Sequence, residues 1–161
     1  MCVRKADISD FDTIFRITQE TIRTIYPHYY PTGAVDFFLS HHSAENIVRD
    51  IENDLVYMCI DSYMNAVGTV TVRDNELCRL FVLPKHQGNG YGRTLLNFAE
   101  EQIAQKYDSI VLDASLPAKS IYLSRGYVIT GSHTVAAQNG DFLCYDVMQK
   151  SVTDKNSAKP L

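Results

Sequence analysis

The residues with the clearest chemical meaning are three glycines that alternate along one short stretch, Gln87-Gly-Asn-Gly-Tyr-Gly-Arg93. An apolar run ends at Pro84, and a helical spacing of apolar residues begins just after the glycines. Glycine permits backbone conformations and close approaches that a side chain prevents. The N-terminus of a helix presents free N–H groups and a partial positive charge. Strand, glycine-rich turn and helix in this order predict a loop that binds phosphate groups through its main chain.

Two common phosphate-binding motifs do not fit this stretch. The dinucleotide fingerprint GxGxxG, counted from Gly88 and Gly90, would need a third glycine where Arg93 stands. The Walker loop GxxxxGK[ST], with Gly92 as its second glycine, would need its first glycine at Gln87. A sharp turn that binds no ligand is the alternative interpretation.

Cysteine and histidine side chains could do nucleophilic or metal chemistry, but their spacing does not favour it. The four cysteines, Cys2, Cys59, Cys78 and Cys144, form no CxxC pair and have no histidine at ligand spacing. Each falls in a predicted strand, so we expect small, buried apolar side chains. The five histidines are scattered along the chain. We therefore expect neither a metal site nor a redox motif.

The elements that would position the glycine loop follow from hydrophobic periodicity. Helical spacing predicts helices at residues 11–26, 34–42, 43–54, 94–106 and 117–126. Strands are predicted at residues 2–6, 55–61, 67–74, 75–83, 109–114, 127–137 and 142–150. The nearly unbroken apolar run at 109–114 suits a strand of a parallel pair that is covered on both faces. This order predicts an α/β fold with a mixed, mostly antiparallel central sheet and flanking helices.

Composition limits the class of protein. The chain has 161 residues, which suggests a single domain at 1–150, followed by a polar tail at 151–161 that we expect to be disordered. The net charge of −4 disfavours a nucleic-acid partner. No apolar run is long enough to span a membrane, and the first residues lack a signal-peptide core, so a cytoplasmic protein is expected.

The stretch around the glycines resembles the GCN5-related N-acetyltransferase superfamily. Residues 87–92 match its Q/R-x-x-G-x-G/A motif. Residues 115–127 resemble its N-x-x-A-x-x-x-Y-x-x-x-G-F/Y segment, with Ala118, Tyr122, Gly126 and Tyr127 in place and Ser115 where asparagine is usual. The strong match covers residues 75–127, whereas the N-terminal half agrees only in the order of its elements.

This resemblance implies an acyl-CoA N-acyltransferase fold that uses acetyl-CoA as the acyl donor, with no metal. The strand before the loop and the parallel strand after it splay apart, and the pantetheine arm lies between them. The implied cofactor contacts are the main chain of Leu80, Phe81 and Val82 for pantetheine, Gln87, Gly88, Asn89, Gly90, Gly92 and Arg93 for the phosphates, and Ser115.

Two residues are implied to act on the reacting groups, because the family transfers the acetyl group directly to an amine. Glu76 stands eleven residues before Gln87, where some members carry a catalytic glutamate, and is the candidate base. An ordinary glutamate and an ammonium differ by about 6 pKa units, about 8 kcal/mol, so a base here needs burial or a water relay. Tyr122 is the candidate that protonates, or donates a hydrogen bond to, the leaving sulfur. A solvated carboxylate and a core tyrosine are the alternatives.

A ping-pong route through Cys78 would need a base to form the thiolate, and only Glu76 is near in sequence, so we disfavour it. For the acceptor, the family uses its first helices and their connection. That segment supplies Tyr26, His28, Tyr29 and Tyr30, whose aromatic rings with polar tips suit a small amine and equally suit ordinary packing.

The prediction is therefore an acetyl-CoA-dependent N-acetyltransferase that acts on a primary amine of a small molecule or peptide. A non-catalytic acyl-CoA-binding regulatory module and a purely structural glycine turn are the alternatives. The identity of the acceptor stays open at this point. An exposed strand edge in the C-terminal hairpin would allow a homodimer.

Overall fold

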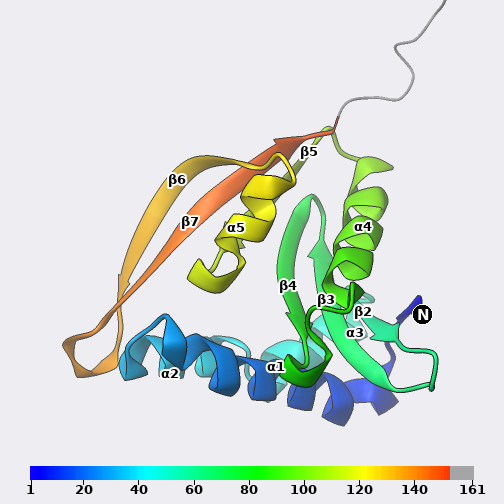
Figure 1. Ribbon diagram of the computed structural model, residues 1–161, viewed down its shortest axis with the longest axis horizontal. Helices are drawn as coiled ribbons and strands as arrows, with labels where there is room; N and C mark the ends of the chain where they lie inside the picture. Colours follow the sequence, from blue (N-terminus) through cyan, green and yellow to red (C-terminus); the bar gives the residue numbers. More distant parts are fainter. Residues whose placement is uncertain (153–161) are drawn as a thin grey trace, which may run out of the picture.

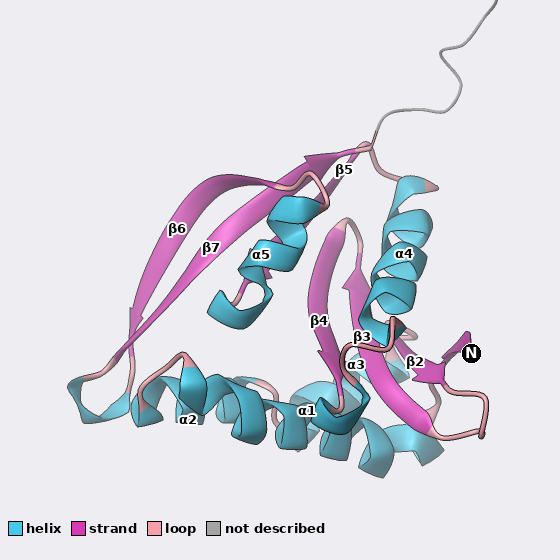
Figure 2. Ribbon diagram, viewed as in Figure 1, coloured by secondary structure: helices cyan, strands magenta, loops and turns pink. Residues whose placement is uncertain are grey.

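The structure is a computed structural model that describes residues 1–152. Of the tail predicted at 151–161, Ser151 is the last residue of a strand, and 153–161 lie outside the described residues. Its strands form one seven-stranded sheet in the order β1-β2-β3-β4-β5-β7-β6. Their bounds are β1 Cys2–Lys5, β2 Val56–Ile60, β3 Ala66–Arg73, β4 Glu76–Val82, β5 Ser109–Ala114, β6 Val128–Ala136 and β7 Phe142–Ser151. All neighbouring strands are antiparallel except β4 and β5, which are parallel. The predicted mixed sheet is confirmed (Figure 2).

Within residues 1–152, five α-helices flank the sheet: α1 Phe11–Ile25, α2 Thr32–His41, α3 Ala44–Glu52, α4 Tyr91–Ala104 and α5 Leu116–Ser124. Helices α1 and α3 pack with β2 around Ile14, Ile47 and Met58. Helix α4 packs on the other face, where Leu95 and Leu96 meet strand residues such as Val70. Both faces of the first strands are thus covered by apolar side chains, which fixes their positions.

The sheet divides between its two parallel strands. Glu76 and Val111 are the one register pair between β4 and β5, and Figure 1 shows the two arms spreading apart from there. A β-bulge lies at the same point, because Thr71 and Val72 of β3 pair with Arg79 and Leu77 and leave Cys78 unpaired. A bulge bends and twists its strand. The bulge therefore accounts for the departure of β4 from β5.

The bulge also changes the side of the sheet to which the β4 side chains point. Leu77 packs in the α4 cluster, and so do Leu80 and Val82 beyond the bulge. Phe81 packs instead with residues of α1 and α2. Strict alternation from Leu77 would have placed Phe81 on the α4 side. The extra residue Cys78 shifts the pattern by one.

Helices α1 and α2 run across the open end of the V-shaped sheet (Figure 1). Gly33 at the start of α2 lies so close to the short 3₁₀ helix Gln138–Gly140 that a side chain there would collide with the Gln138 main chain. The Gly33 N–H also donates to Asp141 Oδ2 at 2.8 Å. These contacts join the helical layer to the β6–β7 arm.

The structure corrects some details of the sequence prediction. The helix after the glycine loop begins at Tyr91, three residues earlier than predicted, because Gly90 ends the turn in a left-handed conformation with φ of 86°. The cysteines all lie on strands, but Cys2 and Cys144 are exposed, so the expectation of buried side chains is wrong for these two. Strand β6 is an edge of the sheet.

Candidate active site

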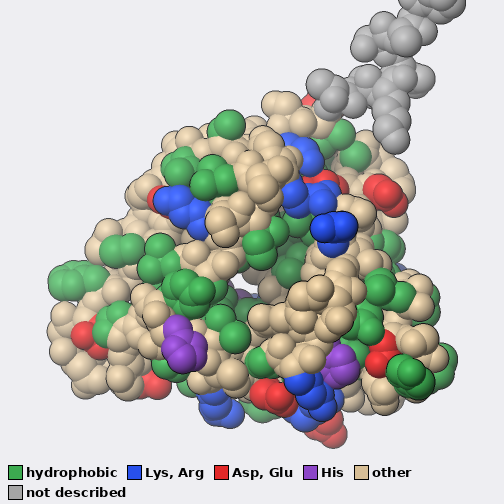
Figure 3. Space-filling view, in the orientation of Figure 1, with side chains coloured by type: hydrophobic (Ala, Val, Ile, Leu, Met, Phe, Trp, Pro, Cys, Tyr) green, Lys and Arg blue, Asp and Glu red, His purple; other side chains and the backbone are tan. Residues whose placement is uncertain are grey.

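A cavity of about 960 Å³ lies where the sheet divides, and it is lined by α1–α3, β4, the glycine loop and α5. Its size is at the upper end of the range for small-molecule sites. Figure 3 shows a hollow in the middle of this face, with Lys and Arg side chains gathered beside its upper rim. The predicted site residues that line it are Glu76, Tyr122, Leu80, Phe81, Val82, Gln87, Gly88, Gly92, Arg93, Ser115, Tyr26, His28 and Tyr29. Asn89, Gly90 and Tyr30 are not in its wall.

The glycine loop has the backbone that main-chain anion binding requires. Gly88 and Gly90 have φ of 79° and 86°, a region that favours glycine. No atom of the described residues lies within 4 Å of the place where a side chain on either would begin. Asn89 Nδ2 donates to the main-chain oxygens of His86 and Gln87, both at 3.1 Å. Asn89 thus holds the loop from within, and the N-terminus of α4 faces open space.

Gln87 and Val82 form the junction between strand and loop. Gln87 Nε2 donates to the Val82 carbonyl at 3.0 Å. The Thr21 hydroxyl lies 3.2 Å from the same oxygen, but its one proton has a shorter bond to the Ile17 carbonyl at 2.7 Å. The Gln87 side chain therefore points back to β4 rather than into the loop.

The main chain of β4 alternates between its two edges. The Phe81 carbonyl lies against Gly68 of β3, 2.9 Å from where a Cβ on that glycine would stand. In an antiparallel pair, residues on either side of one that faces its partner strand point the other way. Leu80 and Val82 therefore face the edge that β5 has left, and the Phe81 main chain does not.

Tyr122 extends from α5 into the same cavity and is 7% exposed. Its ring meets that of Tyr127 edge-on, with centroids 5.5 Å apart. Within residues 1–152 its hydroxyl has no hydrogen bond, and it is not among the side-chain atoms sealed away from solvent. Burial raises the pKa of Tyr122 above the ordinary value of a phenol. The hydroxyl is thus a protonated donor that faces the cavity.

Glu76 and Cys78 lie at the start of β4, and both line the cavity. The Cys78 thiol donates to the Glu76 main-chain oxygen at 3.8 Å. Burial, with a further contribution from Glu76, raises the pKa of Cys78 to about 12. A thiol with this pKa stays neutral near pH 7. The raised pKa therefore also disfavours a ping-pong route in which Cys78 is the nucleophile.

The four aromatic residues proposed for the acceptor divide into two pairs. Tyr26 Oη donates to Ser115 Oγ at 3.3 Å, and Tyr30 Oη accepts from the Leu116 N–H at 2.7 Å. These two tyrosines therefore tie the helical layer to the start of α5. Tyr29 is exposed, and it lies with His28 at the rim of the cavity.

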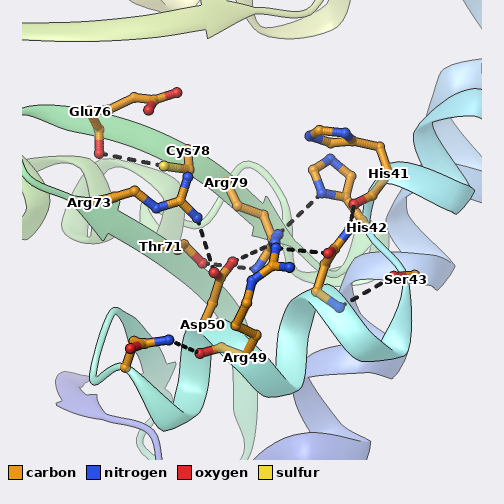
Figure 4. Close-up of polar contacts among 12 residues, drawn as sticks. His41, His42, Ser43, Arg49, Asp50, Thr71, Arg73, Glu76, Cys78 and Arg79 are labelled. Carbon is orange, nitrogen blue, oxygen red and sulfur yellow. Dashed lines mark hydrogen bonds and ion pairs between the residues drawn. The ribbon is translucent and has the colours of Figure 1, made fainter.

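A charged network that we did not predict forms another part of the wall (Figure 4). Asp50 Oδ2 accepts from Arg79 Nη2 at 2.9 Å, and Asp50 Oδ1 accepts from Arg73 Nη2 at 3.0 Å. Arg79 Nε donates to His42 Nδ1 at 3.2 Å, and Arg79 Nη1 donates to Thr71 Oγ1 at 3.2 Å. Burial lowers the pKa of Arg79 and, together with that arginine, lowers the pKa of His42 well below its usual value. The sequence contains one sign of this network: Asp50 shares the apolar face of a helix with Ile47 and Ile51, and a buried aspartate usually has a charged partner.

Among residues 1–152, no three His, Cys, Asp or Glu side chains lie close enough together to hold a metal ion. None of the helices in these residues is both long and apolar enough to cross a bilayer.

Comparison with known proteins gives a consistent fold. A GCN5-related N-acetyltransferase of Rhodopseudomonas palustris has a TM-score of 0.84 at 22% identity, over 94% of this chain and 95% of that one. The PaiA N-acetyltransferase of Thermoplasma acidophilum in complex with coenzyme A has a TM-score of 0.68 at 20% identity, over 94% and 98%. The YncA putative acetyltransferase of Salmonella typhimurium with its cofactor acetyl-CoA has a TM-score of 0.65 at 19% identity, over 100% and 99%.

None of the curated protein sequences compared with the chain matches it. A family model does match. The model described as an acetyltransferase (GNAT) domain aligns with residues 25–143, which include the glycine loop, the open edge of β4 and Tyr122. The chain therefore belongs to the GNAT family of acetyltransferases.

Proposed function

We propose that this protein transfers the acetyl group of acetyl-CoA directly to a primary amine of a small molecule or peptide. The observation that carries the proposal is the meeting of three features in one cavity: the open glycine loop, the free edge of β4 and the hydroxyl of Tyr122. Each corresponds to a different part of the donor. The loop suits the pyrophosphate, the strand edge suits the amides of the pantetheine arm, and the phenol suits the sulfur.

The main chain would provide most of the donor contacts. N–H groups at the start of α4 and in the loop would bind the phosphates, because Gly88 and Gly90 leave them unobstructed. Arg93 lines the cavity beside them and adds a positive charge. Leu80 and Val82 would pair with pantetheine, and because Gln87 already donates to the Val82 carbonyl, the Val82 N–H is the group we expect to pair. Asn89 would act by shaping the loop.

The chemical step needs a neutral amine and a stabilised leaving sulfur. Glu76 would receive the proton of the amine, directly or through a water molecule, as the nitrogen bonds to the thioester carbon, because that bond makes the N–H far more acidic than in a free ammonium. Tyr122 would donate a hydrogen bond to the sulfur. Full proton transfer would be uphill, because the raised pKa of the phenol exceeds the pKa of a thiol, about 8.5.

The test is thiol release from acetyl-CoA with a panel of primary amines. We expect turnover by the wild type and a loss of at least about tenfold in kcat for Tyr122→Phe, below the usual acid–base contribution because only a hydrogen bond is lost. Tyr107→Phe is the matched control, since that hydroxyl bonds Asp74 on the surface, outside the cavity. Tight binding of acetyl-CoA without turnover of any amine would refute the proposal and favour a non-catalytic acyl-CoA module.

Gly92 tests the donor site separately. A Cβ on Gly92 would meet only Val82 Cγ2, at 3.8 Å, so Gly92→Ala should keep the fold and bind coenzyme A. Gly92→Glu would place a carboxylate against the phosphates, and we expect the Kd for coenzyme A to rise at least about tenfold. Asn97→Glu carries the same charge on an exposed position of α4 that is outside the cavity wall, and it should bind normally. Equal binding by all variants would sink the assignment of the loop.

A further inference from the structure

Two arginines in the cavity wall have hydrogen-bond donors to spare. Arg49 on α3 donates from Nη2 to Asn46 Oδ1 at 2.8 Å, and within residues 1–152 it forms no ion pair. Arg73 on β3 is 45% exposed and uses Nη2 for Asp50. A guanidinium has five N–H groups. Most donors of Arg49 and Arg73 are therefore available to a molecule in the cavity.

His42 adds a third donor at the same place. Its Nδ1 accepts from Arg79, so this nitrogen carries a lone pair and the neutral ring has its proton on Nε2. His42 is 7% exposed, yet its Nε2–H has no partner in the described part of the chain. Only Thr18 Oγ1 and Tyr127 Oη are sealed and unsatisfied there, so Nε2 is reached from the cavity that His42 lines. The ring is fixed as a donor, which excludes it as a base in this state.

The charges around these donors leave one positive charge uncompensated. Three guanidiniums, Arg49, Arg73 and Arg79, line this part of the wall, whereas the carboxylates beside them are Asp50 and Glu76. Figure 4 shows the Arg73 and Arg79 side chains converging on Asp50, with the His42 ring beside Arg79. This wall therefore favours an anionic group.

An acidic side chain lies elsewhere in the cavity wall. Asp113 on β5, the strand that departs from β4, lines the cavity. Loss of solvent raises the pKa of Asp113, while His133 and His41 oppose that rise. A ligand with both charges would therefore direct its anionic group to the arginines and its amine away from them.

We propose that Arg49, Arg73 and His42 bind a carboxylate of the acetyl acceptor, so that the acceptor is a small amino acid or a similar carboxylate-bearing primary amine. A planar carboxylate matches the fork of a guanidinium, and a second arginine and an imidazole N–H would fill its remaining acceptor positions. This inference rests on the proposed function, because it names the substrate class of the same site.

The experiment compares matched acceptors at saturating acetyl-CoA. Leucine, phenylalanine and alanine are each paired with their amides, and phosphoethanolamine represents an amine with a phosphate. We expect kcat/KM for each acid to exceed that for its amide by at least about tenfold, the scale of one hydrogen bond to a charged group. The amine of each amide is less basic than that of the acid, so more of it is neutral and able to react. This difference favours the amides and therefore works against the expected result.

Variants assign the effect to the two arginines. Arg49→Gln and Arg73→Gln should each raise KM for the acids at least about tenfold and leave the amides within about twofold. Arg16→Gln is the control, because Arg16 also has one carboxylate partner, Glu20, but lies outside the cavity. Arg49→Gln breaks no ion pair of residues 1–152, whereas Arg73→Gln breaks the pair with Asp50. If Arg73→Gln folds poorly, Arg49→Gln is therefore the decisive variant.

Three results would overturn the inference: equal use of acids and amides, better use of phosphoethanolamine, or no difference between Arg49→Gln and Arg16→Gln. If no amine is acetylated, the proposed function fails by itself. The inference is then judged by calorimetric titration of the protein with leucine and leucinamide. Tighter binding of leucine that is lost in Arg49→Gln would support it, and equal or absent binding would refute it.

Discussion

Removing the Asp50 carboxylate should destabilise the protein far more than breaking a surface ion pair. The side chains of Asp50 and Arg79 are 3% and 5% exposed, and their Oδ2 and Nη2 atoms are 2.9 Å apart. Asp50→Ala leaves the Arg79 guanidinium buried, and its only remaining partners among residues 1–152 are Thr71 and His42. Loss of one member of a buried pair costs about 3–5 kcal/mol, because the remaining charge keeps its desolvation cost without its counter-charge. We expect a loss of that size in the free energy of unfolding.

The assay is urea denaturation of Asp50→Ala, Arg79→Met and the double variant at neutral pH. Arg79→Met should cost less than Asp50→Ala, because Asp50 keeps its bond to Arg73. The double variant should recover much of the loss in Asp50→Ala, because it contains no buried unpaired arginine. Near-additive effects of the two substitutions would contradict this account.

Arg4→Met is the matched control. Arg4 and Asp10 form two hydrogen bonds of 2.7 Å, shorter than the Asp50–Arg79 bond, but the Arg4 side chain is 46% exposed. Solvent screening and side-chain entropy limit such pairs to about 1 kcal/mol or less. If Arg4→Met lowers the free energy of unfolding as much as Asp50→Ala does, then burial rather than bond length does not set the size of the loss, and the prediction is refuted.

Three further predictions follow from the same structure. Because the pKa of His42 is lowered in the folded protein, the imidazole is protonated in the unfolded chain at a higher pH than in the folded one. The free energy of unfolding should therefore fall as pH drops below about 6.5, by at most about 1.36 kcal/mol per pH unit. In denaturation measured over a pH series, His42→Asn should flatten this dependence, and His41→Asn, at an exposed position, should not. Cys78→Ala should keep kcat for acetyl transfer within about threefold in the thiol-release assay, because a thiol with a pKa of about 12 is not an effective nucleophile, and loss of all turnover in a folded variant would revive the ping-pong route. Gly33→Ala should lower stability by about 1–3 kcal/mol in urea denaturation through collision with the Gln138 main chain, whereas Gly131→Ala, whose Cβ would meet only Val147 at 3.9 Å, should not.

Local patterns in the sequence were sufficient for the elements and for the glycine loop. Residues 109–114 show this well, because their apolar run has the bounds observed for β5. Gly88 and Gly90 were equally readable, since their positive φ is a property of the local backbone. Periodicity and glycine chemistry depend on neighbours in the chain, so one sequence is enough to find them.

The contacts that shape the rest of the cavity join residues distant in the chain. The hydrogen bond between Tyr30 and Leu116 spans 86 positions, and that between Arg79 and His42 spans 37. A tyrosine or a histidine in a helical connection has the same local signature whether it holds the fold or faces a ligand. The separation of Tyr26 and Tyr30 from Tyr29 therefore required the tertiary structure.

The bulge at Cys78 was the decisive feature that periodicity could not supply. Read as a regular strand, β4 places Leu77, Arg79 and Phe81 on one face, with an arginine among apolar side chains of the α4 layer. The extra residue turns Arg79 to the other face, where Asp50 and His42 meet it. The same bend takes β4 away from β5 and exposes the main chain of Leu80. One irregular residue therefore both opens the strand edge proposed for the acyl donor and orients the arginine that fixes the tautomer of His42 on the side proposed for the acceptor.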